Sequence, residues 1–419
     1  MAAGRIQATY RIETALDPQH AAAVMAGEQS TGTFVAVPGE TVRLRERFGA
    51  RVERVTLGDT VATPALPGAQ TPRGSQAPRY TRAEVVLSWP LENVGPSLPN
   101  LLATVAGNLF ELREVSGLRL MDLELPGAFA EAYPGPRFGV QGTRALTGVR
   151  GRPLIGTIIK PSVGLSPQET ATLAGALARA GLDFIKDDEL MANPPHSPLE
   201  QRARAVLREL DVVAQETGRK VMYAANITDD FEAMKRHHDT VVAAGGTCVM
   251  VSINSIGLTG VAALRRYCTL PIHGHRNGWG AMTRCPALGM EFRAYQKLCR
   301  LAGVDHLHTN GLRNKFYESD DSVVAAVRDC LTPLWGGYAV APVLSSGQWA
   351  GQAPDTYARI GSVDLLYLCG GGIIAHPAGV AAGVRSVLQG WEAALSGIDL
   401  ATYARDHPEL RQAIEAFGP

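Results

Sequence analysis

Apolar runs of strand length alternate with longer amphipathic stretches through the last two thirds of the chain. Eight such runs cover residues 153–160, 183–186, 221–227, 248–254, 270–275, 305–308, 338–344 and 364–370. Between them, apolar residues recur with helical spacing, most regularly over 198–218, 231–246 and 320–331. Eight strands alternating with helices predict a closed parallel (β/α)8 barrel. A doubly wound open sheet is the alternative, but no G-x-G-x-x-G turn follows the first strand.

The first 145 residues show a different pattern. Apolar or alternating runs over 8–14, 31–37 and 80–90 predict strands, while 17–29 and 97–112 predict helices. Residues 63–79 are rich in Pro, Gly, Gln and Ala, which indicates a surface loop. We therefore expect an N-terminal α+β domain over residues 1–145 and a barrel domain over residues 146–419.

Composition and charge narrow the range of partners. The 419-residue chain is 46% hydrophobic, and its 40 basic side chains balance 40 acidic ones, so no overall field favours nucleic acid or an anionic membrane. The uncharged stretch 241–264 contains glycines and polar side chains that are costly in hydrocarbon, so we do not expect it to span a membrane. The N-terminus lacks the apolar core of a signal peptide, and the six cysteines are singly spaced. These features favour a cytoplasmic protein without a disulfide framework or a zinc site.

Polar residues and glycines follow the predicted barrel strands. The second strand ends in "DFIKDDE", where Lys186 precedes Asp187, Asp188 and Glu189. Such a cluster is costly through self-repulsion, and either a metal ion or an ordinary solvated turn would explain it. The other strand ends carry Lys160, Asn226, Asn254, His273, His275, Arg276, His306, His308, Ser345–Gly347 and Gly370–Gly372. Because barrel chemistry gathers at the carboxyl ends of the strands, we expect these residues on one rim.

Several motifs in this order resemble a known family. The segments "TIIKPSVGLS", "DFIKDDE", "HGHR", "HLHTNG" and "GGGIIAHPAG" occur at spacings similar to those in the large subunit of ribulose bisphosphate carboxylase (RuBisCO). The likeness covers nearly the whole chain, and in detail the chain resembles a RuBisCO-like protein and not a carboxylase. The resemblance implies a ferredoxin-like N-terminal domain followed by a (β/α)8 TIM barrel.

The resemblance also implies a metal site and catalytic residues. In it, Lys186 captures carbon dioxide as a carbamate (N6-carboxylysine) and binds one Mg²⁺ together with Asp188 and Glu189, whereas Asp187 is not a ligand. Oxygen ligands suit a hard dication and would offset the repulsion in the cluster. The implied catalytic residues are Lys160, Lys186, His275 and the mobile-loop Lys315.

The substrate-binding residues implied by the resemblance come from both domains. On the barrel they are Arg276, His308, Ser345, Gly347, Gly370 and Gly371, which would hold the anionic groups of a phosphorylated sugar or sugar acid. In the N-terminal domain, Glu28, Thr33 and Asn108 match residues that complete the site of a neighbouring subunit. We therefore expect a homodimer with shared active sites, which could assemble into a higher oligomer.

Departures from the family pattern indicate which reaction to expect. Ser162 replaces a second lysine of the first strand, Trp279 replaces a histidine, and residues 192–198 replace a polar segment, which argues against carbon dioxide fixation. We expect a Mg²⁺-dependent lyase of sugar-acid catabolism that decarboxylates a 3-oxo sugar-acid phosphate through an enediolate. The implied substrate is 3-oxo-isoapionate 4-phosphate, giving erythrulose phosphate. The alternatives are an enolase or isomerase of methylthio-pentulose phosphates in methionine salvage, and a binding or stress-response protein without catalysis.

Overall fold

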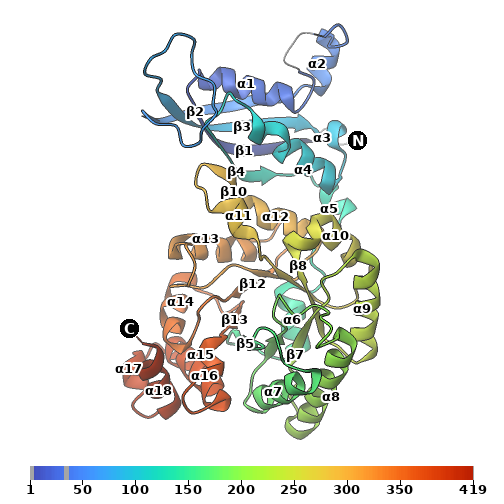
Figure 1. The fold of residues 1–419 in the computed structure, drawn as a ribbon, viewed down its shortest axis with the longest axis vertical. Coiled ribbons are helices and arrows are strands. Elements are labelled where there is room, and N and C mark those ends of the chain that lie inside the picture. The colour runs from blue at the N-terminus through green and yellow to red at the C-terminus, as the bar shows by residue number, and fades with distance from the viewer. Residues whose placement is uncertain (1–3, 33–36, 419) are drawn as a thin grey trace. The chain divides into compact units, whose positions relative to one another are not determined.

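The computed structural model describes residues 4–32 and 37–418, and these form two compact units. The first unit extends to Tyr133 and also includes Gly278–Leu301, and the second comprises Pro134–Asn277 and the chain from Ala302 onward. Figure 1 shows the elements of both units in sequence colours. The division into domains at residues 145 and 146 stays a prediction.

The first unit is built on a five-stranded sheet. Its strands are β1 (Arg5–Thr14), β2 (Arg51–Val61), β3 (Tyr80–Pro90), β4 (Gly117–Glu124) and β10 (Leu288–Met290), in the order β10-β4-β1-β3-β2. Strand β1 pairs antiparallel with both β3 and β4, whereas β10 adds parallel to β4. In β1, the side chains of Ile6, Ala8, Tyr10 and Ile12 are buried and the residues between them are more exposed, which is the two-residue period of a half-buried strand.

The helices of the first unit complete a ferredoxin-like arrangement. They are α1 (Pro18–Glu28), α2 (Val42–Phe48), α3 (Leu91–Val94), α4 (Leu98–Ala106), the 3-10 turn η1 (Asn108–Glu111), α5 (Ala128–Ala132), α11 (Trp279–Thr283) and α12 (Phe292–Ala302). Helices α1 and α4 connect β1 to β2 and β3 to β4, so the order β-α-β-β-α-β and the sheet order 4-1-3-2 confirm the predicted fold class.

Some elements of the first unit differ from the prediction. Four residues of the strand predicted at 31–37, residues 33–36, lie outside the described residues. Strands β2 and β4 and helix α2 were not predicted, and the helix predicted over 97–112 divides into α4 and η1. Most side chains of β2 are exposed, so charged residues mask the alternation of its apolar ones.

The second unit is a closed barrel of eight parallel strands. These are β5 (Leu154–Ile158), β6 (Phe184–Lys186), β7 (Met222–Asn226), β8 (Cys248–Ser252), β9 (Ile272–His275), β11 (His306–His308), β12 (Ala341–Leu344) and β13 (Leu366–Leu368). Strand β13 pairs with β5 and closes the barrel. All eight strands lie within the eight predicted runs, which confirms the barrel. Its interior is packed with buried apolar side chains, including Phe184, Met222 and Leu368.

Helices surround and cap the barrel. They are α6 (Gly139–Thr147), α7 (Pro167–Arg179), α8 (Leu199–Thr217), α9 (Phe231–Ala243), α10 (Ile253–Tyr267), α13 (Asp320–Leu331), η2 (Ala350–Gln352), α14 (Ala353–Ile360), α15 (Gly371–Ile374), α16 (Val380–Ser396), α17 (Leu400–Tyr403) and α18 (Pro408–Phe417). Val140 of α6 packs into the same apolar cluster as the strands. Within the described ranges, no helix is both long and apolar enough to cross a membrane.

Candidate active site

Lys186 is the last residue of β6 and is almost completely buried. Its Nζ donates a hydrogen bond to the carbonyl oxygen of Asp187 at 2.7 Å and lies 3.8 Å from Glu189 Oε2. Burial lowers the pKa of Lys186, and the nearby carboxylates oppose this only in part. Because only a neutral amine is nucleophilic, this environment favours the reaction of Lys186 with carbon dioxide.

Asp188 forms an ion pair with Lys160, the lysine that follows β5. Lys160 Nζ lies 2.7 Å from Asp188 Oδ2 and also donates to Ser162 Oγ at 2.7 Å. Burial raises the pKa of Asp188, but the hydrogen bond from Lys160 and one from the backbone N–H of Leu190 outweigh it, so the net pKa is lowered. Asp188 therefore presents a carboxylate, and Ser162 occupies a hydrogen-bonding position beside Lys160.

Asp187 forms hydrogen bonds with buried groups inside the barrel unit. Its Oδ2 accepts hydrogen bonds from Arg202 Nη2 at 3.2 Å and from the backbone N–H of Asn226 at 3.0 Å, and its Oδ1 accepts from the Tyr223 hydroxyl at 2.5 Å. The same Arg202 also donates to the backbone carbonyls of Met191, Ala192 and Ser197. Asp187 thus anchors the guanidinium that shapes the divergent segment 192–198, and its oxygens are engaged away from the metal candidates.

His275 stands beside Glu189 at the end of β9. Its Nε2 lies 3.5 Å from Glu189 Oε2, and its Nδ1 accepts a hydrogen bond from the backbone N–H of Asn277 at 3.2 Å. Asn254 Nδ2 donates to the carbonyl of Asn277 at 2.9 Å and fixes this turn. Burial, reinforced by the charge of Lys186, lowers the pKa of His275 to about 4, so the imidazole is neutral near pH 7.

Lys186, Asp188 and Glu189 fit a Mg²⁺ site only if the lysine contributes oxygen. Within residues 4–32 and 37–418, no group of three or more His, Cys, Asp or Glu side chains is arranged to hold a metal ion. Carbamylation of the buried amine would add an anionic oxygen ligand to the two carboxylates. The resulting set contains oxygen donors alone, as Mg²⁺ prefers.

Arg276 is paired with an acidic residue that the sequence reasoning missed. Arg276 Nη2 lies 2.7 Å from Glu318 Oε2, and Asn310 Nδ2 donates to the same oxygen at 2.7 Å. The other carboxylate oxygen, Oε1, accepts from Ser322 Oγ at 3.0 Å. Glu318 follows Lys315 by three residues, but nothing in that spacing shows that the chain returns to Arg276.

His308 belongs to a buried row of three histidines. His273 Nε2 lies 2.8 Å from His308 Nε2, and His273 Nδ1 lies 3.3 Å from His306 Nδ1. The row continues from His306 Nε2 to Thr143 Oγ1 at 2.8 Å, and from His308 Nδ1 to Ser345 Oγ at 3.1 Å. Burial lowers the pKa of all three imidazoles. His306 is the first residue of β11 and His273 is the second residue of β9, so both lie within their strands inside the barrel, and the expectation that they lie at the rim is wrong.

The glycines after β12 and β13 leave backbone accessible. No atom lies within 4 Å of the position that a Cβ of Gly371 would occupy, and the nearest atom to a Cβ of Gly370 is 3.9 Å away. Gly347 has a φ of +87°, which favours glycine, and the backbone N–H of the neighbouring Lys315 donates to the Ser346 carbonyl at 3.2 Å. Open backbone of this kind can cradle an anion.

The predicted residues of the first unit are only partly described. Asn108 Nδ2 donates to Glu28 Oε1 at 3.5 Å, so these two candidates lie together on an exposed part of the unit. Thr33 lies outside the described residues. Trp279 is buried in the first unit, with its ring 4.3 Å from that of Tyr295, so it has a packing role there.

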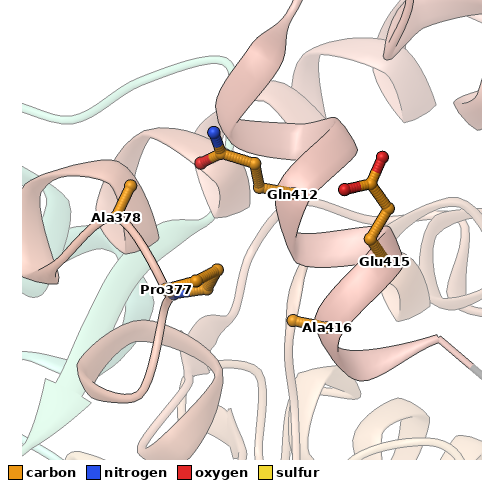
Figure 2. Close-up of a pocket in the computed structure, with 5 residues that line it drawn as sticks. All are labelled: Pro377, Ala378, Gln412, Glu415 and Ala416. Atoms are coloured by element: carbon orange, nitrogen blue, oxygen red, sulfur yellow. The ribbon is translucent and has the colours of Figure 1, made fainter.

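Figure 2 shows a separate hollow on the barrel unit, where Pro377 and Ala378 face residues of α18. Its volume is about 390 Å³, and its other lining residues are Gln412, Glu415 and Ala416. It contains none of the predicted site residues, so it is distinct from the candidate active site.

Comparisons with known proteins place both parts of the chain in a family. The model for the ribulose bisphosphate carboxylase large chain, catalytic domain, matches residues 139–417, and that for the large chain, N-terminal domain, matches residues 3–129. In the solved structures, the chain is similar to a rubisco-like protein from Burkholderia fungorum, with a TM-score of 0.92, 50% identity, and coverage of 99% of this chain and 100% of that one. An octameric RuBisCO from Pyrococcus horikoshii gives a TM-score of 0.88 at 30% identity, covering 99% and 93%.

Two curated relatives carry functional names. The chain is 55% identical to a "3-oxo-isoapionate-4-phosphate transcarboxylase/hydrolase" of Xanthobacter autotrophicus, over 98% of both chains. It is 48% identical to a "3-oxo-isoapionate-4-phosphate decarboxylase" of Rhizobium etli, again over 98% of both.

Proposed function

This chain belongs to the ribulose bisphosphate carboxylase large-chain family, and from that premise we propose that it is a decarboxylase of a 3-oxo sugar-acid phosphate. The proposed substrate is 3-oxo-isoapionate 4-phosphate, and the products are carbon dioxide and erythrulose phosphate. The observation that carries this choice is that a single lysine, Lys160, follows β5 at the rim. Its Nζ is hydrogen-bonded to Ser162, which replaces the second lysine of the family pattern, and to Asp188. The identity to the Rhizobium etli decarboxylase supports it.

The chemistry of a β-keto acid explains why one lysine suffices. Cleavage of the bond to the carboxylate releases carbon dioxide and leaves the electron pair on the neighbouring carbon as an enolate, so no base is needed to begin the reaction. Lys186 (as its carbamate), Asp188 and Glu189 would hold Mg²⁺, which when bound would supply positive charge beside the ketone oxygen. Lys160 would then donate a proton to the carbon that lost the carboxylate.

The other rim residues would orient the substrate. Open backbone at Gly370 and Gly371, with the cation of Lys315, would hold the phosphate. The imidazole of His275, which lies 3.5 Å from Glu189, would hydrogen-bond a substrate oxygen near the carboxylates. These contacts would keep the bond to be broken perpendicular to the ketone plane, where the departing electrons overlap with the carbonyl.

We further propose that the active unit is a homodimer with shared sites, which could assemble into higher oligomers. Glu28, Thr33 and Asn108 would complete the rim of the neighbouring subunit. The octameric state of the RuBisCO from Pyrococcus horikoshii supports assembly of this fold with copies of itself.

A second candidate is favoured by the name of the 55% identical relative, which is a transcarboxylase/hydrolase. In that case, the carboxyl carbon of the same substrate would remain in a non-gaseous product. The test uses substrate labelled with ¹³C at the carboxylate, incubated with Mg²⁺ and bicarbonate-activated protein. Labelled carbon dioxide and erythrulose phosphate in equal amounts are expected, with Lys186→Ala as the inactive control. Consumption of the substrate without labelled gas would favour the second candidate, and turnover of methylthioribulose phosphate alone would overturn both.

A further inference from the structure

We propose that three buried side chains fix the direction of the hydrogen bond between His308 and Ser345 at the rim. The three are Thr143, His306 and His273, which act as positioning residues and do not touch the substrate. Their effect is that Ser345 Oγ faces the substrate as a hydrogen-bond acceptor. The direction of the row rests on the hydrogen-bond geometry and the burial of the histidines, whereas the identity of the group that it recognises rests on the proposed function.

The direction is set at the interior end of the row. The Thr143 hydroxyl lies 2.5 Å from the carbonyl oxygen of Gly139. Two oxygens at that separation repel each other unless a hydrogen lies between them, so Thr143 donates its only hydroxyl proton to Gly139. Thr143 Oγ1 can then only accept a hydrogen bond from His306. The proton between Thr143 and His306 is therefore on His306 Nε2, at 2.8 Å.

Each neutral imidazole passes this direction to the next. A neutral imidazole has one N–H and one bare nitrogen, so His306 with a proton on Nε2 must accept at Nδ1. His273 therefore donates from Nδ1 to His306 and accepts at Nε2, where His308 Nε2 lies 2.8 Å away. His308 in turn donates from Nε2 and is bare at Nδ1. The complete burial of His273 and His306 keeps these rings neutral.

The rim end of the row is Ser345. With His308 Nδ1 bare, the hydroxyl of Ser345 donates to it across 3.1 Å. Ser346 directs its own proton to Asn310 Oδ1 at 2.9 Å, so it does not supply one to Ser345. The remaining lone pairs of Ser345 Oγ can therefore accept a hydrogen bond from the substrate.

An acceptor at this position selects against phosphate. A phosphate dianion presents only lone pairs, whereas a sugar hydroxyl brings the proton that Ser345 Oγ lacks. The adjoining cation is also neutralised, because Arg276 lies 2.7 Å from Glu318, and Asn310 connects that pair to Ser346. We infer that this sector binds a hydroxyl-bearing end of the substrate and that the single phosphate binds at Gly370 and Gly371.

The test removes the hydrogen-bond acceptor, the Thr143 hydroxyl, at the interior end of the row. Thr143→Val has nearly the same shape but gives His306 Nε2–H no acceptor, which favours the opposite tautomer of His306. The reversal would pass along the row, so His308 would carry its proton on Nδ1 instead of Nε2. Thr143→Ser keeps the hydroxyl and is the matched control. ¹⁵N NMR of imidazole-labelled protein distinguishes the two nitrogens, and loss of signals in His308→Gln assigns them.

Three measurements decide the proposal. The parent and Thr143→Ser proteins are expected to show N–H at His308 Nε2, and Thr143→Val at Nδ1. With 3-oxo-isoapionate 4-phosphate, Thr143→Val is expected to raise KM about tenfold with a smaller change in kcat, as for loss of one hydrogen bond. A parent protein with N–H at His308 Nδ1, or a His308 that becomes an imidazolium when inorganic phosphate is added, would overturn the proposal. Since reading the parent tautomers needs neither Thr143→Val nor turnover, they decide the direction of the row even if Thr143→Val does not fold or the proposed substrate is wrong.

Discussion

The ammonium of Lys160 lies 2.7 Å from Oδ2 of Asp188 and joins the candidate proton donor to a candidate metal ligand. A cation bound by Asp188 would compete with Lys160 for this carboxylate. Metal binding and the position of the candidate proton donor would therefore be coupled at one oxygen atom.

Lys160→Ala is expected to lower kcat by about 10²–10⁴-fold, the usual contribution of a positioned general acid, with a smaller change in KM. The measurement is the rate of carbon dioxide release, with deuterium uptake into the product from D2O as a second readout. Ser162→Ala is the matched control, because it removes one hydrogen bond of Lys160 but leaves the amine. A kcat for Lys160→Ala within twofold of the parent would exclude Lys160 as the proton donor.

Lys186→Met is expected to abolish activity and Mg²⁺ binding while leaving the fold intact, because methionine fills the buried site but cannot form a carbamate. Titration of Mg²⁺ by calorimetry with and without bicarbonate measures the first effect. Since burial lowers the Lys186 pKa below 10.5, the neutral amine fraction rises with pH in the window below that value. Activation by bicarbonate should therefore be faster at pH 8.5 than at pH 6.5. Full activity in the presence of a chelator would contradict the metal site.

Asp187→Ala is expected to destabilise the protein by about 3–5 kcal/mol, because it leaves the buried guanidinium of Arg202 without its carboxylate. Tyr223→Phe removes one hydrogen bond to Asp187 and should cost only about 1 kcal/mol. Urea unfolding of both variants tests the structural role of Asp187. Equal losses for the two would mean that the pairing with Arg202 contributes little.

The histidine row should make stability depend on pH. Burial lowers the pKa of His306 to about 3 from an ordinary value of 6.5. Between these values the unfolded chain binds a proton that the folded chain does not, so stability falls as the pH falls from 6.5 toward 3. The slope for one such group is about 1.4 kcal/mol per pH unit. His306→Gln should reduce the slope of the unfolding free energy between pH 6.5 and 5 by about this amount, and an unchanged slope would show that His306 is protonated in the folded protein.

Shared sites predict complementation between inactive chains. Glu28→Gln and Lys186→Ala each inactivate a different part of a composite site, so mixed dimers contain one site with neither change. Mixing the two proteins after mild dissociation should recover up to about a quarter of the parent activity, by statistical pairing. Mass spectrometry of the intact dimers provides the control for subunit exchange. Confirmed hybrids without activity would show that the sites are not shared.

The barrel and most of its rim follow from the sequence because both depend on local pattern. Buried parallel strands are short apolar runs, and the residue after such a run lies at the rim wherever the strand closes. Lys186, His275 and Gly370 could therefore be placed without knowing their partners.

The contacts between those residues could not be predicted in the same way. Asp187 and Asp188 are adjacent in the sequence just after β6, but their side chains have different partners, Arg202 for Asp187 and Lys160 for Asp188. Arg202 lies on a predicted helix and Glu318 in a loop, but neither pattern indicates which partner the side chain reaches. The proposed direction of the histidine row depends on Thr143, which belongs to a helix preceding the first barrel strand.

Strand β10 delays the completion of the first unit's sheet during synthesis, because it lies far along the chain from the other four strands. The ferredoxin-like sheet is encoded by residues before Tyr133, but its parallel edge next to β4 is supplied by Leu288–Met290. On the ribosome, the edge of β4 that β10 later covers stays unpaired until residue 290 of 419 has emerged. An exposed strand edge is a ready template for pairing with another chain. The nascent protein is therefore exposed to misassembly on a polysome while β5 to β9, the first five strands of its barrel, are being made.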